Sequence, residues 1–129
     1  MSKTIIHTKN APAAVGPYSQ AVAVDNLVYT AGQIPLDPQT GKMIDGAISA
    51  QTERALLNLQ AVLQAAGSSL ADVIKTTVFL QDMGEFGAMN AVYGRFFSEN
   101  PPARSAVEVA ALPLGARVEI EAVAIVNQE

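Results

Sequence analysis

The sequence contains no cysteine, and this absence excludes disulfides, thiolate metal sites and cysteine nucleophiles together. Its single histidine, His7, cannot form a zinc cluster alone. Charge is also scarce, since 16% of the 129 residues are Asp, Glu, Lys or Arg and the formal net charge is −4. The eight basic residues are scattered, so no cluster favours nucleic-acid phosphates. We therefore expect neither a metal site nor a nucleic-acid partner.

Long apolar runs are absent too. No segment approaches the roughly 18 apolar residues of a membrane-spanning helix. The first residues, MSKTIIHTKNAP, lack both the apolar core of a signal peptide and the Arg-rich character of a transit peptide. These features predict a soluble, cytoplasmic protein without a membrane partner. Because half of the residues are apolar and tryptophan is absent, the core must consist mainly of Ala, Val, Leu and Ile. The length fits one domain, 1–129.

The first half of the chain predicts three strands and a helix. The strands are short segments rich in branched residues, at 3–8, 21–25 and 27–32, with a turn at Asp25-Asn26 between the last two. A loop with two prolines follows. Leu56, Leu59 and Leu63 recur at helical spacing, which predicts a helix from about Ile48 to Ala66 with Gly67 as its C-terminal cap.

The second half predicts a strand, a helix and two further strands. The strand at 72–82 is almost continuously apolar at its centre, which indicates burial on both faces. Asp82 and Glu85 form an Asp-x-x-Glu start signal for a helix that ends before Pro101-Pro102. Its apolar stripe consists of Phe86, Met89, Tyr93, Phe96 and Phe97. The final strands are predicted at 104–110 and 116–126, joined by the loop 112–115.

This order, β-β-β-α-β-α-β-β, predicts an α+β fold of ferredoxin-like plan, with both helices on one face of a single sheet. The last strand shows what covers the other face. Its even-numbered residues from Val118 to Val126 are all apolar, whereas its odd-numbered face begins with Arg117, Glu119 and Glu121 and ends with Val123 and Ile125. A solvent face would stay polar, so we expect it to be partly buried against another copy of the chain.

Arg104 and Glu119 are charged residues on the last two predicted strands, and the distance between them bears on how a site could use both. If the last two strands paired as a hairpin about Pro113-Leu114, Arg104 would lie opposite residue 123, about 13 Å from Glu119 at 3.4 Å per residue. That distance exceeds the reach of one small ligand. A site that uses both residues must therefore take them from neighbouring subunits.

Six motifs, in this order along nearly the whole chain, resemble the YjgF/RidA family of reactive-intermediate (imine) deaminases: GPYSQA, TAGQIP, DVIKTTVFLQD, MNAVYGRFF, PPARSAVEVAALP and VEIEAVA. The resemblance implies a chorismate-mutase-like fold with one six-stranded mixed sheet and two helices on one face. It also implies a homotrimer with clefts between subunits. In that fold the central strand separates the last two strands, so the hairpin distance is only indicative.

The resemblance further implies a hydrolase of amino-acid metabolism. Such enzymes convert 2-aminoacrylate, 2-iminopropanoate and 2-iminobutanoate to 2-keto acids and ammonia, and use no cofactor. A non-catalytic regulatory trimer that binds small carboxylates is the alternative, because binding and catalysis would share the same arginine. RNA cleavage, a label of some relatives, is disfavoured by the acidic balance and the lack of a histidine pair.

Carried over by motif, the catalytic residues are Arg104, Glu119 and Tyr18, and the substrate-binding residues are Arg104, Gly32, Asn90 and Ser105. The planar guanidinium of Arg104 suits a carboxylate beside a C=N bond. Glu119 would orient or deprotonate water, Tyr18 would close the cleft or share a proton, and Gly32 would permit close approach of the ligand.

Structural roles stay open for the same residues. Arg104 and Glu119 also fit surface or interface charges, and Tyr18, Asn90 and Gly32 also fit turn, helix and backbone roles. Arg117, Glu121 and His7 are interpreted as structural or solvated. Ala106 stands where many relatives have cysteine, which excludes thiol regulation here, and Ala31 stands where serine is also common.

Overall fold

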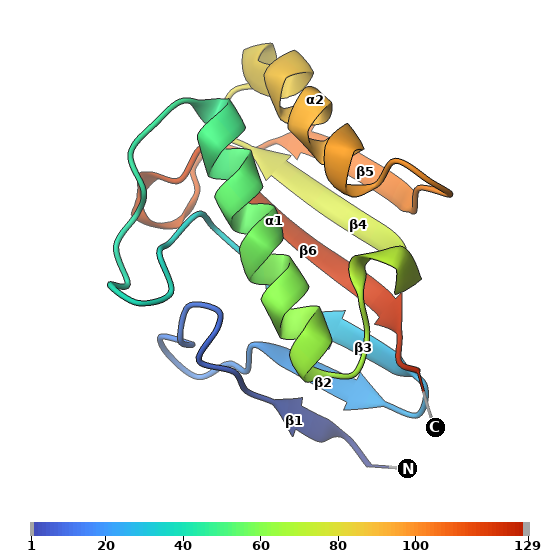
Figure 1. The fold of residues 1–129 in the computed structure, drawn as a ribbon. Helices are drawn as coiled ribbons and strands as arrows, with labels where there is room; N and C mark the ends of the chain where they lie inside the picture. Colours follow the sequence, from blue (N-terminus) through green and yellow to red (C-terminus); the bar gives the residue numbers. More distant parts are fainter. Residues whose placement is uncertain (1, 128–129) are drawn as a thin grey trace.

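Figure 1 shows the computed structural model, which describes residues 2–127 as a six-stranded sheet with two helices on one face. The elements are β1 (Thr4–Ile6), β2 (Ala21–Val24), β3 (Leu27–Thr30), α1 (Ile48–Ala65), β4 (Val73–Leu80), α2 (Phe86–Phe96), β5 (Ala103–Glu108) and β6 (Val118–Ile125). The strand order is β1-β2-β3-β6-β4-β5, and only β4 and β5 are parallel. The predicted α+β fold with a mixed sheet is confirmed.

The last two strands, β5 and β6, do not pair as a hairpin. β4 lies between β5 and β6, as Figure 1 shows in yellow between orange and red. Parallel β4 and β5 need a crossover, and α2 provides it. In the resulting register Arg104 is opposite Thr76, and Glu119 is opposite Phe79. The arrangement implied by the family resemblance is the one observed.

Helix α1 ends as its sequence predicts. The Gly67 N–H donates to the Gln64 carbonyl, and the Ser68 N–H donates to the Leu63 carbonyl. These two bonds form a Schellman motif, which requires a left-handed residue, and Gly67 has φ +81°. The fully buried Leu56, Leu59 and Leu63 face the core from α1.

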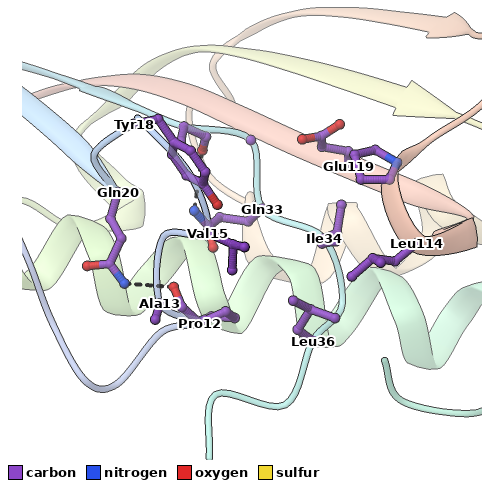
Figure 2. Close-up of a pocket in the computed structure, with 13 residues that line it drawn as sticks. Pro12, Ala13, Val15, Tyr18, Gln20, Gln33, Ile34, Leu36, Leu114 and Glu119 are labelled. Carbon is purple, nitrogen blue, oxygen red and sulfur yellow. Dashed lines mark hydrogen bonds between the residues drawn. The ribbon is translucent and has the colours of Figure 1, made fainter. Parts of the chain in front are cut away.

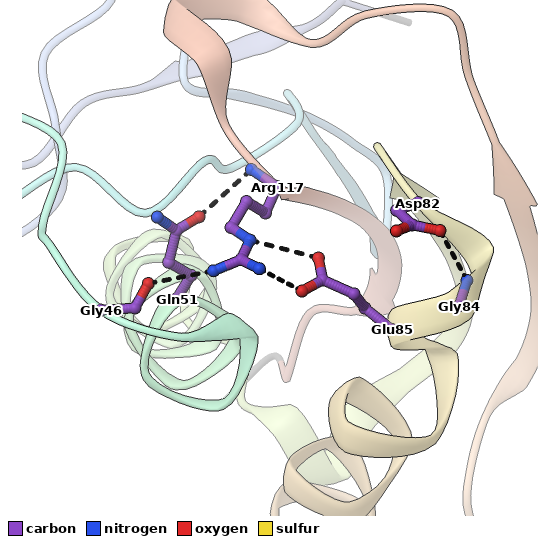
Figure 3. A network of polar contacts seen from close by, with 6 residues as sticks. All are labelled: Gly46, Gln51, Asp82, Gly84, Glu85 and Arg117. Carbon is purple, nitrogen blue, oxygen red and sulfur yellow. Dashed lines mark hydrogen bonds and ion pairs between the residues drawn. The ribbon is translucent and has the colours of Figure 1, made fainter.

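Helix α2 begins later than the start signal predicts. Asp82 accepts a hydrogen bond from the Gly84 N–H at 2.8 Å and caps a 3₁₀ turn, Met83–Glu85, so the α-helix starts at Phe86. Glu85 does not return a capping bond. Its carboxylate instead pairs with Arg117 at the start of β6, as Figure 3 shows.

Arg117 ties together three parts of the fold. Besides its bonds to Glu85, its guanidinium donates to the Gly46 carbonyl at 3.3 Å, and its backbone N–H donates to Gln51 Oε1 at 3.1 Å (Figure 3). The network connects the start of β6 with the start of α2 and with the loop and first turn of α1. The contacts agree with the structural interpretation of Arg117.

The two faces of the sheet differ as the last strand predicts. Val118, Ile120, Ala122 and Ala124 are buried beneath the helices. On the other face Tyr29 is 48% exposed and Val107 42% exposed, and both helices lie across the opposite face of the sheet (Figure 1). β4 is correspondingly buried on one face only, so the expectation of burial on both faces is not met within one chain. Across residues 2–127, neither helix combines the length and the apolar character that crossing a membrane demands.

Candidate functional site

A pocket of about 520 Å³ opens beside β6 at the Glu119 end of the strand. Three loops form it, and Figure 2 shows Tyr18 and Glu119 along one side with Pro12 and Leu36 on the other. The pocket is lined by Pro12, Ala13, Val15, Tyr18, Gln20, Ala31, Gly32, Gln33, Ile34, Leu36, Pro113, Leu114 and Glu119. Tyr18, Gly32 and Glu119, which the motifs predict for a common site, all line this pocket.

Gln20 holds the first of these loops. Its side-chain oxygen accepts from the Thr8 N–H at 2.7 Å, and its amide nitrogen donates to the Thr8 carbonyl at 3.1 Å. The same nitrogen donates to the Pro12 carbonyl at 2.8 Å (Figure 2). Gln20 is only 3% exposed. A buried amide with several partners fixes loop backbone strongly, because breaking the set would leave polar groups unpaired. The loop that carries Val15 and Tyr18 is thereby anchored.

Asn58 holds the second loop. It is fully buried in α1 and donates to the carbonyls of Ile34 and Leu36 at 3.1 and 2.9 Å. The backbone N–H of Gln33 donates to the Ile120 carbonyl at 2.8 Å, and the Ile120 N–H returns the bond at 3.1 Å. These contacts place the segment after β3 directly alongside β6.

Gly32 is consequently pressed against Glu119. A Cβ atom on residue 32 would lie 2.7 Å from the Glu119 carboxyl carbon and 2.8 Å from its Cγ, closer than such atoms approach. The backbone of Gly32 is not left-handed. A side chain at residue 32 would therefore force the Glu119 carboxyl group out of its present position. The close approach of a ligand to Gly32 stays a prediction.

Glu119 is half-buried on the uncovered face of the sheet. Burial raises the pKa of its carboxyl above the ordinary value, and the negative charge of Glu121 raises this pKa further. A carboxyl with a raised pKa is a stronger base once it is ionised. This is the property expected of a group that removes a proton from water. Tyr18, 52% exposed, lines the same pocket.

Arg104 lies elsewhere, under α2 at the edge strand β5. Its Nη1 donates to Asn90 Oδ1 at 2.7 Å, and its guanidinium carbon is 4.7 Å from the ring centre of Tyr93 and 5.4 Å from that of Phe86. A second cavity, of about 400 Å³, is lined by Arg104, Asn90 and Tyr93 together with Pro101-Pro102. Arg104 and Asn90 are thus brought together as predicted.

Within one chain the two halves do not meet. β5 and β6 are two strands apart, and Thr76 and Phe79, their partners on β4, are three residues apart. Two strand spacings across the sheet and three residues along β4 each correspond to about 10 Å. Because these two directions are perpendicular, the backbones of Arg104 and Glu119 are roughly 14 Å apart. Their side chains also lie on opposite faces, because Arg104 shares the helix-covered face with Thr76.

Ser105, predicted to bind substrate, lies on the face opposite Arg104. Its hydroxyl accepts a hydrogen bond from Lys75 Nζ at 3.1 Å. On this uncovered face it is in register with Thr77 and Glu121. The prediction for Ser105 therefore needs the uncovered face to belong to a cleft.

Several residues that shape the site escaped the sequence analysis. Gln20, although it lies in the GPYSQA motif, and Asn58 were not predicted to shape the site, since nothing in the sequence marks an amide as buried. Phe86 and Tyr93 were assigned to the apolar stripe of the helix. Their spacing to Asn90, four and three residues, places all three on one side of α2 and is the signal that links them to Arg104. Throughout residues 2–127 no three His, Asp or Glu side chains gather as metal ligands.

Comparison with known proteins identifies the fold and the family. The family model described as endoribonuclease L-PSP matches residues 8–126. The 2-iminobutanoate/2-iminopropanoate deaminase of Mus musculus is 50% identical over 123 residues, which cover 95% of this chain and 90% of the mouse protein.

Solved structures agree closely. Yeast Mmf1 superposes with a TM-score of 0.95 at 41% identity, covering 98% of this chain and 100% of that protein. E. coli TdcF, solved with bound serine, gives a TM-score of 0.91 at 44% identity, covering 96% and 99%. Because family model, sequences and structures all match over almost the full length, the chain belongs to the YjgF/RidA family.

Proposed function

We propose that the protein is a hydrolytic deaminase of small 2-imino acids. Water adds to the C=N carbon of a 2-imino acid, and the resulting carbinolamine loses ammonia to leave a 2-keto acid. The reaction consumes one water and involves no oxidant or reductant. The name of the mouse relative supports this activity. The chemistry of the Glu119 pocket and of the cavity beside Arg104 also supports it.

The observation that carries the proposal is an arginine without an acidic partner. The ion pairs found among residues 2–127 involve Arg95 and Arg117, and Arg104 forms none. Its charge is therefore available to a ligand, and a guanidinium fork binds a carboxylate through two parallel hydrogen bonds. Every 2-imino acid carries a carboxylate next to the reacting carbon.

Glu119 supplies the second function. We assign it the role of accepting a proton from the attacking water, for which its raised pKa is suited. The neutral carboxyl formed in this way can then give the proton to the departing nitrogen. Tyr18 lies on the same side of the pocket as Glu119, and we assign it the role of closing over the substrate.

A homotrimer with clefts between subunits joins the two halves. Arg104 of one subunit would meet Glu119, Tyr18 and Gly32 of its neighbour. The exposed apolar side chains on the uncovered sheet face, including Tyr29 and Val107, support burial of this face by another copy.

The test measures pyruvate released from 2-aminoacrylate, which a pyridoxal-phosphate-dependent dehydratase generates in the assay from serine. Added wild-type protein is expected to accelerate release, and Arg104→Ala to abolish the acceleration. Arg95→Ala is the matched control, because Arg95 is exposed and its pairing with Glu53 is loose at 3.8 Å. Acceleration by Arg104→Ala equal to that of wild type would contradict the role of Arg104.

The alternative functions predict different results. A regulatory binder would bind 2-oxobutanoate through Arg104 but leave pyruvate release unchanged. A ribonuclease would cleave RNA, and the net charge of −4 and the single histidine disfavour it. Incubation of the protein with single-stranded RNA at low salt checks this directly.

A further inference from the structure

The environment of Arg104 is aromatic where a carboxylate would be usual. Phe86, Asn90 and Tyr93 project from one side of α2, and all three contact the guanidinium. The guanidinium carbon lies over the two rings, and Nη1 donates a hydrogen bond to the amide oxygen of Asn90. This arrangement uses one of the five N–H donors of the guanidinium and leaves the others for a ligand.

An aromatic face and a carboxylate differ in one decisive way. Both attract a guanidinium, but a carboxylate neutralises its charge and occupies its fork, whereas a ring leaves both in place. An arginine that binds an anion must be held in position while its charge and its N–H donors stay available to the anion. The rings beside Arg104 meet this need.

Tyr93 is the more rigid of the two rings. It is 5% exposed, its hydroxyl lies 2.7 Å from Thr76 Oγ1, and its ring centre is 4.6 Å from that of Phe97. Thr76 is itself 1% exposed and is the register partner of Arg104 on β4. Tyr93 is therefore fastened to the strand residue that lies beside Arg104.

We propose that Tyr93 is a positioning residue that holds the Arg104 guanidinium in the orientation that receives the substrate carboxylate. The inference rests on the proposed function for the identity of that carboxylate. Burial raises the pKa of Tyr93, against the lowering effects of Thr76 and Arg104, so the phenol stays neutral and contributes its ring. Asn90, predicted to bind substrate, acts in this arrangement first on Arg104.

The experiment compares Tyr93→Leu, Tyr93→Phe and Val92→Ala in the full-length protein. Tyr93→Leu removes the ring, and Tyr93→Phe keeps the ring but removes the bond to Thr76. Val92→Ala is the matched control, because Val92 is the preceding residue of α2 and is 4% exposed, and it lies about 100° around the helix from Tyr93. Three readouts are used: the NMR shift of Arg104 Nε–H, the Kd of 2-oxobutanoate by calorimetry, and KM with kcat.

In wild type, the ring current of Tyr93 is expected to displace the Arg104 Nε–H resonance from its free-chain position. Tyr93→Leu is expected to return this resonance toward that position and to raise both Kd and KM about tenfold, with a smaller change in kcat. Tyr93→Phe is expected to stay within about threefold of wild type. Val92→Ala is expected to lower Tm without moving the resonance or Kd.

Failure of the inference and failure of the proposed function give different patterns. If wild type hydrolyses imines and Tyr93→Leu keeps its resonance, Kd and KM, the positioning role is wrong. If wild type binds 2-oxobutanoate through a Tyr93-dependent Arg104 but hydrolyses no imine, the positioning role stands and the deaminase activity does not. A wild type that binds no 2-oxobutanoate contradicts the positioning role as stated.

Discussion

Gly32 and Glu119 lie close together in the pocket, and their close approach gives a prediction for a single added atom. In Gly32→Ala the added Cβ cannot coexist with the present position of the Glu119 carboxyl group. The carboxylate must move by about 1 Å, which is enough to cost roughly a hundredfold in kcat/KM. Because Gly32 is not left-handed, the fold itself should tolerate alanine.

Gly87→Ala is the matched control for this substitution. Gly87 lies in α2, and a Cβ there meets nothing within 4 Å. Alanine in a helix should stabilise the protein by about 0.5–1 kcal/mol and leave activity unchanged. Steady-state kinetics and thermal melts of both variants check the prediction, and an active Gly32→Ala protein would show that Glu119 need not stay in place.

Glu121 gives a prediction for pH dependence. Its negative charge raises the pKa of Glu119, after the larger effect of burial. If ionised Glu119 is the base, kcat/KM falls as pH decreases through its pKa. Glu121→Gln removes the like charge, so the pKa of Glu119 decreases and the acid limb of the profile moves to lower pH. The exposed Glu99→Gln is the control, and an unmoved limb in Glu121→Gln would contradict the electrostatic link.

At the scale of elements, local signals predicted helices better than strand neighbours. Helical spacing and Gly67 located α1 and its end, because both depend on residues within a few positions. The pairing of β5 with β4 depends instead on the crossover through α2, which no local pattern encodes. α2 starts at Phe86, later than predicted, because Glu85 pairs with the distant Arg117 and does not cap the helix.

The site shows the same division. Motifs predicted roles for Arg104, Glu119, Tyr18 and Gly32, but nothing local showed that Arg104 and Glu119 lie on opposite faces of the sheet. That fact follows from register across β4. The roles of Gln20 and Asn58 were also out of reach, because a buried amide acquires its partners only in the folded chain.

The Arg117–Glu85 pair joins the start of β6, which carries Glu119, to the start of α2, which carries Asn90. Glu85→Gln removes the charge but keeps the size of the side chain. The pair is partly exposed, so we expect a loss of about 1 kcal/mol of unfolding free energy and a smaller loss in 1 M salt. Thermal melts at two salt concentrations measure both effects.

The control for this prediction is the second ion pair. Arg95 and Glu53 are more exposed and 3.8 Å apart, so Glu53→Gln should change the free energy of unfolding by less than about 0.5 kcal/mol. Equal losses in the two variants would show that the Arg117 network adds nothing beyond an ordinary surface pair.

At the scale of the whole molecule, the separation of Arg104 from Glu119 makes the assembly testable without a structure. Arg104→Ala and Glu119→Gln proteins should each be inactive. If they are unfolded together and refolded as an equal mixture, a cleft that takes Arg104 from one subunit and Glu119 from the next is intact in roughly a quarter of cases. The mixture should then recover about that fraction of wild-type activity.

A site contained in one chain predicts the opposite, because no chain in the mixture carries both residues and activity stays absent. Simple mixing of the two folded variants, without refolding, is the control for subunit exchange. The double variant Arg104→Ala/Glu119→Gln mixed with wild type completes the set. In that mixture each intact cleft needs two wild-type neighbours, so activity should decrease with the square of the wild-type fraction, whereas a site within one chain gives a linear decrease.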